Sequence, residues 1–150
     1  MKKKIFMLAF VAAGFIVTAN AQNNAIGLRG VYNGAEISFQ HTLVNTNRLE
    51  VDAGFWGNGV NLTGIYQWNW DLAQLADGFK WYAGVGAGAG FWGINDKGYF
   101  NAGVAGQIGI EYNFNIPLQL SLDYRPALYF LGDGKGGYWT NVALGIRYKF

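Results

Sequence analysis

Apolar and polar side chains alternate along almost the whole chain after residue 22, and this period of two most constrains how the chain can fold. Such alternation is typical of strands that present one face to an apolar medium and the other to a polar one. Gly, Asn and Asp signals cut the alternating sequence into short segments. Because no heptad or helical stripe is present, the pattern predicts an all-β fold.

Eight alternating segments are predicted, and they cover residues 24–32, 35–43, 48–56, 60–70, 79–93, 99–114, 118–131 and 138–150. The pair Asn33-Gly34 is a strong signal for a tight hairpin, and the longest connection, 71–78, has room for one helical turn. Eight strands joined by short hairpins predict an antiparallel up-and-down sheet, and eight suffice to close a barrel. Pro126 lies within the seventh segment and removes a ladder hydrogen bond, so we expect a bulge or kink there.

The first 21 residues differ from the rest and are predicted to be a cleavable signal peptide. Three lysines at positions 2–4 precede an apolar stretch, 5–17, that is too short to span a bilayer, and Ala19-x-Ala21 is a small-x-small cleavage site. No cysteine follows this site, so a lipoprotein anchor is excluded. Cleavage leaves residues 22–150 as one domain, which we expect to be exported.

Composition excludes several classes of function. The chain has no cysteine and one histidine, so disulfides, Cys-ligated metals and cysteine nucleophiles are excluded, and nothing implies a cofactor. The signal peptide holds 3 of the 11 basic residues, which leaves 8 against 9 acidic residues. The net charge of +2 therefore belongs to the precursor and gives no support for a nucleic-acid partner.

The polar faces of the segments are also their small faces. In the last segment Val142, Leu144 and Ile146 alternate with Ala143, Gly145 and Arg147. Small polar residues suit a narrow interior, while wide, branched apolar faces suit contact with lipid. A bilayer also forbids unpaired strand edges, which a closed barrel lacks. The sequence thus predicts a transmembrane β-barrel with its polar face inward.

Ten charged residues fall on the predicted inward face, and the other seven of the mature chain lie in or beside connections. The inward set is Arg29, Glu36, Glu50, Asp52, Lys80, Glu111, Asp123, Arg125, Arg147 and Lys149. Because an unpaired buried charge costs several kcal/mol, we expect these residues to form an ion-pair network that largely plugs the lumen. Inward glycines leave a narrow path for very small solutes open as an alternative.

Aromatic residues gather near both ends of the predicted strands. Two levels of amphipathic rings are typical of a protein that meets two membrane interfaces. The predicted girdles contain Trp56, Trp68, Trp70, Trp81, Trp92, Tyr99, Tyr112, Tyr138 and Trp139.

The C-terminal residues Gly145, Tyr148 and Phe150 match the assembly signal of bacterial outer-membrane β-barrels. With the signal peptide and the eight segments, the mature chain resembles small barrels of the OmpA-transmembrane-domain or OmpX type. The resemblance implies the bacterial outer membrane as location, its lipid as surroundings and insertion by the outer-membrane assembly machinery. It also implies a periplasmic N-terminus, with the hairpins at 33–34, 57–59, 94–98 and 132–137 facing outside.

Those outer hairpins are short, and this weakens the case for two functions, adhesion and ligand binding by the loops. Catalysis is not expected either, because His41 would lie at the periplasmic end and Ser38 faces the other side of its strand. The sequence therefore predicts an integral outer-membrane barrel with a structural or surface role. The alternatives are a narrow channel, and an exported soluble lipocalin-like barrel with inverted faces that binds an apolar ligand.

Overall fold

The computed structural model describes residues 23–31, 34–44, 46–56, 59–72, 74–94, 97–132, 136–138 and 141–150, without the side chains of Trp56, Ile94, Lys97 and Tyr138. The predicted signal peptide lies outside these residues. Within them, no helix has the length and apolar character needed to cross a membrane.

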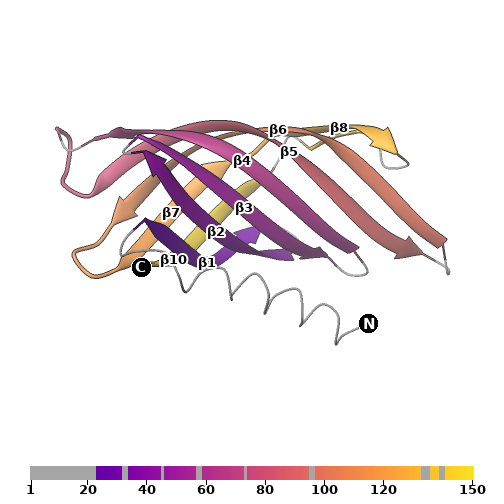
Figure 1. The fold of residues 1–150 in the computed structure, drawn as a ribbon, viewed down its shortest axis with the longest axis horizontal. Coiled ribbons are helices and arrows are strands. Elements are labelled where there is room, and N and C mark those ends of the chain that lie inside the picture. Colours follow the sequence, from indigo (N-terminus) through magenta and orange to yellow (C-terminus); the bar gives the residue numbers. More distant parts are fainter. Residues whose placement is uncertain are drawn as a thin grey trace.

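The strands agree closely with the eight predicted segments (Figure 1). They are β1 (Asn24–Val31), β2 (Gly34–Val44), β3 (Asn47–Trp56), β4 (Gly59–Asp71), β5 (Phe79–Ile94), β6 (Lys97–Asn113), β7 (Leu118–Tyr124), β8 (Ala127–Gly132), β9 (Gly136–Tyr138) and β10 (Val142–Lys149). The seventh predicted segment contains β7 and β8, and the eighth contains β9 and β10.

All strand pairings are antiparallel, and together they close the sheet. Pairing runs in chain order from β1 to β6, then from β6 to β7 and β8. β10 pairs with β7 on one side and with β1 on the other, which joins the end of the chain to its beginning. The predicted fold class, a closed antiparallel barrel of eight strands, is confirmed.

We call the end of the barrel at which β1 begins and β10 ends the proximal end, and the opposite end the distal end. At the proximal end, the Asn24 N–H donates to the Phe150 carbonyl at 3.1 Å, and the connections after β2, β4 and β6 lie there as well. At the distal end, β1, β3 and β5 end and β2, β4 and β6 begin.

The irregularity expected at Pro126 is confirmed, because β7 ends at Tyr124 and β8 begins at Ala127. Proline has no N–H to donate to the ladder. Its carbonyl still accepts from the Gly106 N–H at 2.9 Å, and the Arg125 N–H donates to the Asn141 carbonyl at 2.8 Å. Pairing to both neighbouring strands thus continues across the break.

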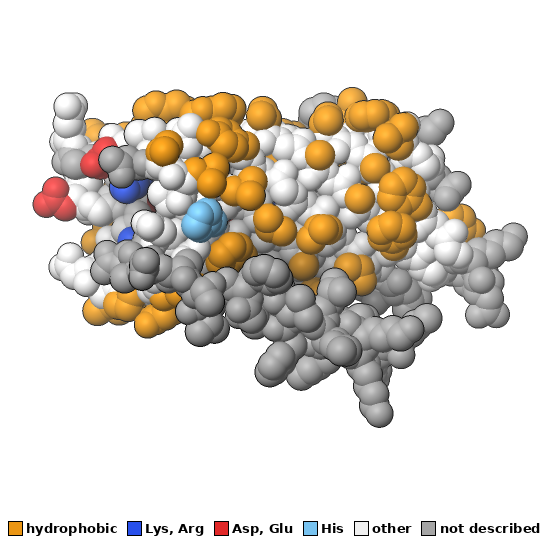
Figure 2. Space-filling model, in the orientation of Figure 1, with side chains coloured by type: hydrophobic (Ala, Val, Ile, Leu, Met, Phe, Trp, Pro, Cys, Tyr) orange, Lys and Arg blue, Asp and Glu red, His pale blue; other side chains and the backbone are white. Residues whose placement is uncertain are grey.

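Burial confirms the predicted assignment of faces. Arg147, Asp123 and Glu50 are 1%, 2% and 0% exposed, whereas Leu144, Val142 and Leu120 are 69%, 52% and 42% exposed. Figure 2 shows hydrophobic side chains spread along the visible wall, while the visible acidic and basic groups lie near one end. A soluble lipocalin-like barrel needs the opposite arrangement, so the structure contradicts that alternative.

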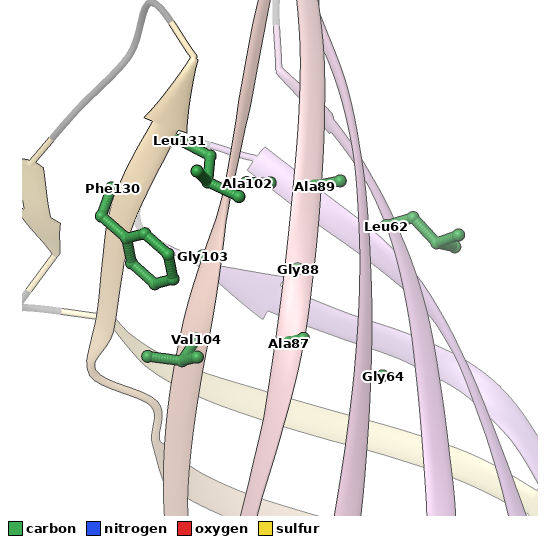
Figure 3. A pocket seen from close by; sticks show the side chains of 10 residues that line it. All are labelled: Leu62, Gly64, Ala87, Gly88, Ala89, Ala102, Gly103, Val104, Phe130 and Leu131. Atoms are coloured by element: carbon green, nitrogen blue, oxygen red, sulfur yellow. The ribbon is translucent and has the colours of Figure 1, made fainter.

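A groove of about 490 Å³ lies on the outer wall, over β4, β5, β6 and β8 (Figure 3). Small residues such as Gly64, Ala87 and Ala102 form its floor, with Leu62 on one side and Phe130 on the other. None of the described residues that line it is charged. The groove is therefore part of the apolar outer surface and separate from the lumen.

Candidate functional site: the charged lumen

Nine buried charged side chains meet inside the barrel, and we call them the charged cluster. They are Arg29, Glu36, Arg48, Glu50, Asp52, Glu111, Asp123, Arg125 and Arg147. They come from β1, β2, β3, β6, β7, β10 and the break between β7 and β8. Alternation brings them together, because every second residue of a strand points to the same face.

Arg125 makes contacts across the full width of the barrel. Its Nη2 donates to Glu50 Oε1 at 2.8 Å and to Asp52 Oδ2, and its Nη1 lies 3.3 Å from Glu36 Oε2. Glu50 and Asp52 lie on β3, which is four strands from β7 in either direction around the closed sheet. The ion pairs of Arg125 therefore connect opposite walls.

Arg29 connects neighbouring walls on one side of the cluster. Its Nη1 donates to Glu36 Oε2 at 2.6 Å, its Nε donates to Asp123 Oδ2 at 3.0 Å, and its Nη2 also bonds Asp123. Arg147 donates through Nε to Ser38 Oγ at 2.9 Å, and its Nη2 lies 3.5 Å from Glu50 Oε1. The cluster is thus continuous from β1 and β10 to β3.

The prediction is wrong for one member of the cluster. Arg48 is one of the seven charges predicted to lie in or beside connections, but its side chain is buried and its Nη1 bonds Glu111 Oε2 at 2.8 Å. The signal was present in the sequence, since Arg48 is two residues from Glu50 and so shares its face. Register explains the burial, because Arg48 pairs with Gln67, whose Oε1 accepts from the Arg48 Nε.

The two lysines of the predicted inward set lie apart from the charged cluster. Lys80 begins β5 and Lys149 ends β10, so both are near the proximal rim, and both are half-buried. The Lys149 Nζ donates to Asn113 Oδ1 at 3.2 Å. Within the described residues, neither lysine forms an ion pair.

Several uncharged side chains complete the cluster, and sequence reasoning did not select them as site residues. Gln40 and Gln67 donate to Glu50 Oε2 at 2.6 Å and 2.9 Å. The fully buried Tyr82 lies against Gly109, where an added Cβ would come within 2.5 Å of its ring, and its hydroxyl is 3.5 Å from Asp123. The absence of a side chain at Gly109 thus provides the space for the Tyr82 ring.

The proximal aromatic residues of the predicted girdles lie together on the outer wall. The Trp70 and Trp81 rings stack with centroids 4.1 Å apart, and the Phe79 and Tyr112 rings lie 4.7 Å apart. Trp68 is 39% exposed. Ring edges in this position are suited to a membrane interface.

The distal aromatic residues require a correction. Trp92 and Tyr99 stack at 5.8 Å, but along their strands they are in phase with the buried inward residues Gly90 and Asn101. This phase places them on the lumen side of the rim, while Phe91 is the outward neighbour, at 60% exposed. The other distal girdle predictions, the side chains of Trp56, Tyr138 and Trp139, lie outside the described residues.

The residues of the predicted assembly signal lie on both faces of the last strand. Tyr148 points outward, is 57% exposed and stacks on Phe150 with ring centroids 6.4 Å apart. Gly145 points into the lumen, where an added Cβ would lie within 2.8 Å of Arg147 Nη1. The ring pair is therefore presented on the outside of the proximal end.

Ser38 and His41 do not form a catalytic pair in this structure. Ser38 is buried and accepts from Arg147, while His41 Nδ1 lies 2.7 Å from Asn24 Oδ1. Among the described residues, no group of three or more His, Cys, Asp or Glu side chains is arranged to hold a metal ion.

A closed barrel of eight strands, with an apolar outer wall and a charged interior, has the architecture of small outer-membrane β-barrels. Comparison with solved structures agrees with this class. Neisserial surface protein A (NspA) matches with a TM-score of 0.63 and 16% identity, over 85% of this chain and 93% of that chain. The N-terminal β-barrel domain of OprF from Pseudomonas aeruginosa matches with a TM-score of 0.63 and 17% identity, over 87% of this chain and 100% of that chain.

Both matched structures are outer-membrane barrels of eight strands. At this level of identity the likeness establishes the fold that the three chains share. Comparison of the sequence with protein-family models found no match, and neither did comparison with curated proteins.

Proposed function

We propose that this chain is an integral outer-membrane barrel whose lumen is plugged by the charged cluster and whose role in the envelope is structural or at the surface. The observation that carries the proposal is the set of ion pairs from Arg125 to Glu50 and Asp52, which cross the barrel between opposite walls. An eight-stranded barrel has room for little more than its own side chains. Side chains that meet across its width therefore leave no wide aqueous path.

The outer wall supports the proposed location. Large apolar side chains on it are exposed along the length of the strands, for example Leu28 at 56%, Val85 at 58% and Ile108 at 53%. Contact with lipid removes the cost of exposing these side chains to water. The surrounding partner is then outer-membrane lipid. The outward Tyr148 and Phe150 rings are the surface that the assembly machinery would read during insertion.

Conductance tests the plug. Folding is checked by the difference in gel mobility between unboiled and boiled samples. The folded protein is then added to planar bilayers, and single-channel currents are recorded. We expect no steady conductance, because an ion would have to separate buried ion pairs, at a cost of several kcal/mol. Bilayers treated with detergent alone are the control. Steady currents in the nanosiemens range from the folded protein would show that the lumen is open.

Two observations favour a second function, a narrow channel for very small solutes. The inward residues of β5 beyond Tyr82 are Gly84, Gly86, Gly88 and Gly90, which occupy little of the lumen. The Gln107 Nε2 and the Arg125 Nε are buried without a hydrogen-bond partner among the residues that the structure describes, and water is the usual partner of such atoms. Small, flickering currents in the same recordings would favour this function over the plug.

A further inference from the structure

Glu50 and Asp52 share one face of β3, but their surroundings differ sharply. Glu50 accepts hydrogen bonds from Gln40, Gln67 and Arg125, and Arg147 adds a longer contact. Among the described residues, Asp52 accepts from Arg125 alone, through Oδ2. Its buried Oδ1 has no hydrogen-bond partner within the same residues, and the whole residue is 1% exposed. A buried carboxylate needs donors on both oxygens, and Asp52 has one on Oδ2 only.

The charge balance of the cluster points to the same residue. Its arginines are Arg29, Arg48, Arg125 and Arg147, and its acids are Glu36, Glu50, Asp52, Glu111 and Asp123. With every group ionised, the acids outnumber the arginines by one. Lys80 and Lys149 do not correct this locally, because both lie at the proximal rim while Asp52 is two positions beyond Glu50 toward the distal end.

Charged groups on several neighbouring elements set the electrostatic field at Asp52. Glu50 precedes it on β3, Glu36 faces it from β2, and Arg29 faces it from β1. Arg125 bonds it from across the lumen. Its cross-strand partners are Ser38 on β2, whose hydroxyl accepts from Arg147, and the uncharged Thr63 on β4. Asp52 therefore faces two acids and shares its bonded arginine with both of them.

We propose that Asp52 is held as a neutral carboxylic acid in the folded barrel, and that its single proton balances the charged cluster. The unpartnered oxygen then belongs to a neutral group, for which burial costs far less than for an ion. The two acids that flank the same arginine nitrogen no longer repel each other as two full charges. This inference concerns the interior of the barrel and does not depend on whether the lumen conducts.

The proposal fixes the sign of a pH dependence. In the unfolded chain an aspartate loses its proton near pH 3.9, so above that pH the folded state binds one more proton than the unfolded state. Stability falls with rising pH wherever the folded state binds more protons. The folding equilibrium constant of the wild type should therefore fall about tenfold per pH unit relative to a variant without this proton.

The test compares Asp52→Asn with Asp123→Asn in unfolding experiments in lipid vesicles from about pH 5 to about pH 9. Asparagine closely matches a neutral aspartic acid in shape and charge, so Asp52→Asn should fold at least as well as wild type at neutral pH. The ratio of the wild-type to the Asp52→Asn folding constant should fall by about tenfold per pH unit over the pH range in which Asp52 keeps its proton in the folded barrel. Asp123→Asn removes one of the two carboxylates that bond Arg29 and should weaken folding.

A second measurement needs no unfolding. Infrared spectra of the wild-type barrel at neutral pH should contain the C=O stretch of a protonated carboxylic acid, and the Asp52→Asn spectrum should lack it. Absence of this band from the wild type would overturn the proposal. So would an Asp52→Asn variant that fails to fold, or one that weakens folding as much as Asp123→Asn. Stability that depends on sodium rather than on pH, and loses this dependence in Asp52→Asn, would show a bound cation in place of the proton.

Discussion

Replacing Arg125 with methionine is expected to lower the free energy of unfolding by about 3 to 5 kcal/mol, the usual cost of breaking a buried ion pair by removing one partner. The guanidinium of Arg125 contacts Glu36, Glu50 and Asp52, all of which are buried. Methionine fills much of the same volume but leaves these acids without their shared partner. Urea unfolding of the barrel in lipid vesicles measures the change.

Lys149→Met is the matched control for Arg125→Met. The lysine also points inward, but it is half-buried at the proximal rim and its Nζ donates to the uncharged Asn113. A change of less than about 1 kcal/mol is expected there, as for partly exposed charges in general. Equal effects of the two substitutions would mean that the contacts of Arg125 add nothing to the stability of the barrel.

Placing an arginine at Leu144 is expected to cost about 2 to 4 kcal/mol in a bilayer, as for cations on the lipid face of a barrel near the membrane midplane. Leu144 is 69% exposed on β10 and lies opposite Leu122, which is 47% exposed. It is four residues from Tyr148, or about 13 Å along the strand. Because strands of such barrels are tilted, this puts Leu144 near the middle of an apolar band about 25 Å tall.

Leu75→Arg is the control for Leu144→Arg. Leu75 is also an exposed leucine, at 82%, but it lies in the connection between β4 and β5 at the proximal end. In contact with water an arginine there should change the free energy of unfolding by less than about 0.5 kcal/mol. If Leu144→Arg were equally harmless in vesicles, the outer wall would not be in contact with hydrocarbon.

The strands and their faces could be predicted because the outer wall of this barrel is apolar and its interior is polar. The alternation of Leu144 with Gly145 and of Leu122 with Asp123 is therefore strict. Pro126 could also be located, because a residue without an N–H cannot take part fully in a ladder. These are local properties that each segment carries in its own sequence.

The contacts within the lumen could not be predicted, because they depend on closure and tilt. Arg125 reaches Glu50 and Asp52 only because β7 comes to lie opposite β3 once the sheet closes. Arg48 begins a strand, where a cation resembles part of a turn, although its spacing of two residues from Glu50 already indicates the inward face. Its register with Gln67 adds the partner that could not be predicted.

The distal aromatic residues were misassigned for a related reason. A ring near the end of a strand matches a membrane girdle by position alone, whereas the face it occupies depends on phase. The pairing of Trp92 with Tyr99, in phase with Gly90 and Asn101, places both rings on the lumen side. The period of two thus predicts the face of an aromatic ring as well as that of a charged residue.

Site-directed spin labelling tests the central assignment of faces most directly, and the chain has no cysteine that would interfere. Single cysteines at Val142, Leu144 and Ile146, and one at Leu75, are labelled and the protein is folded into lipid vesicles. We expect relaxation of the three β10 labels by oxygen, which concentrates in hydrocarbon, and relaxation of the Leu75 label by a water-soluble nickel complex. Strong relaxation of all four labels by the nickel complex would contradict the account, because the outer wall would then face water.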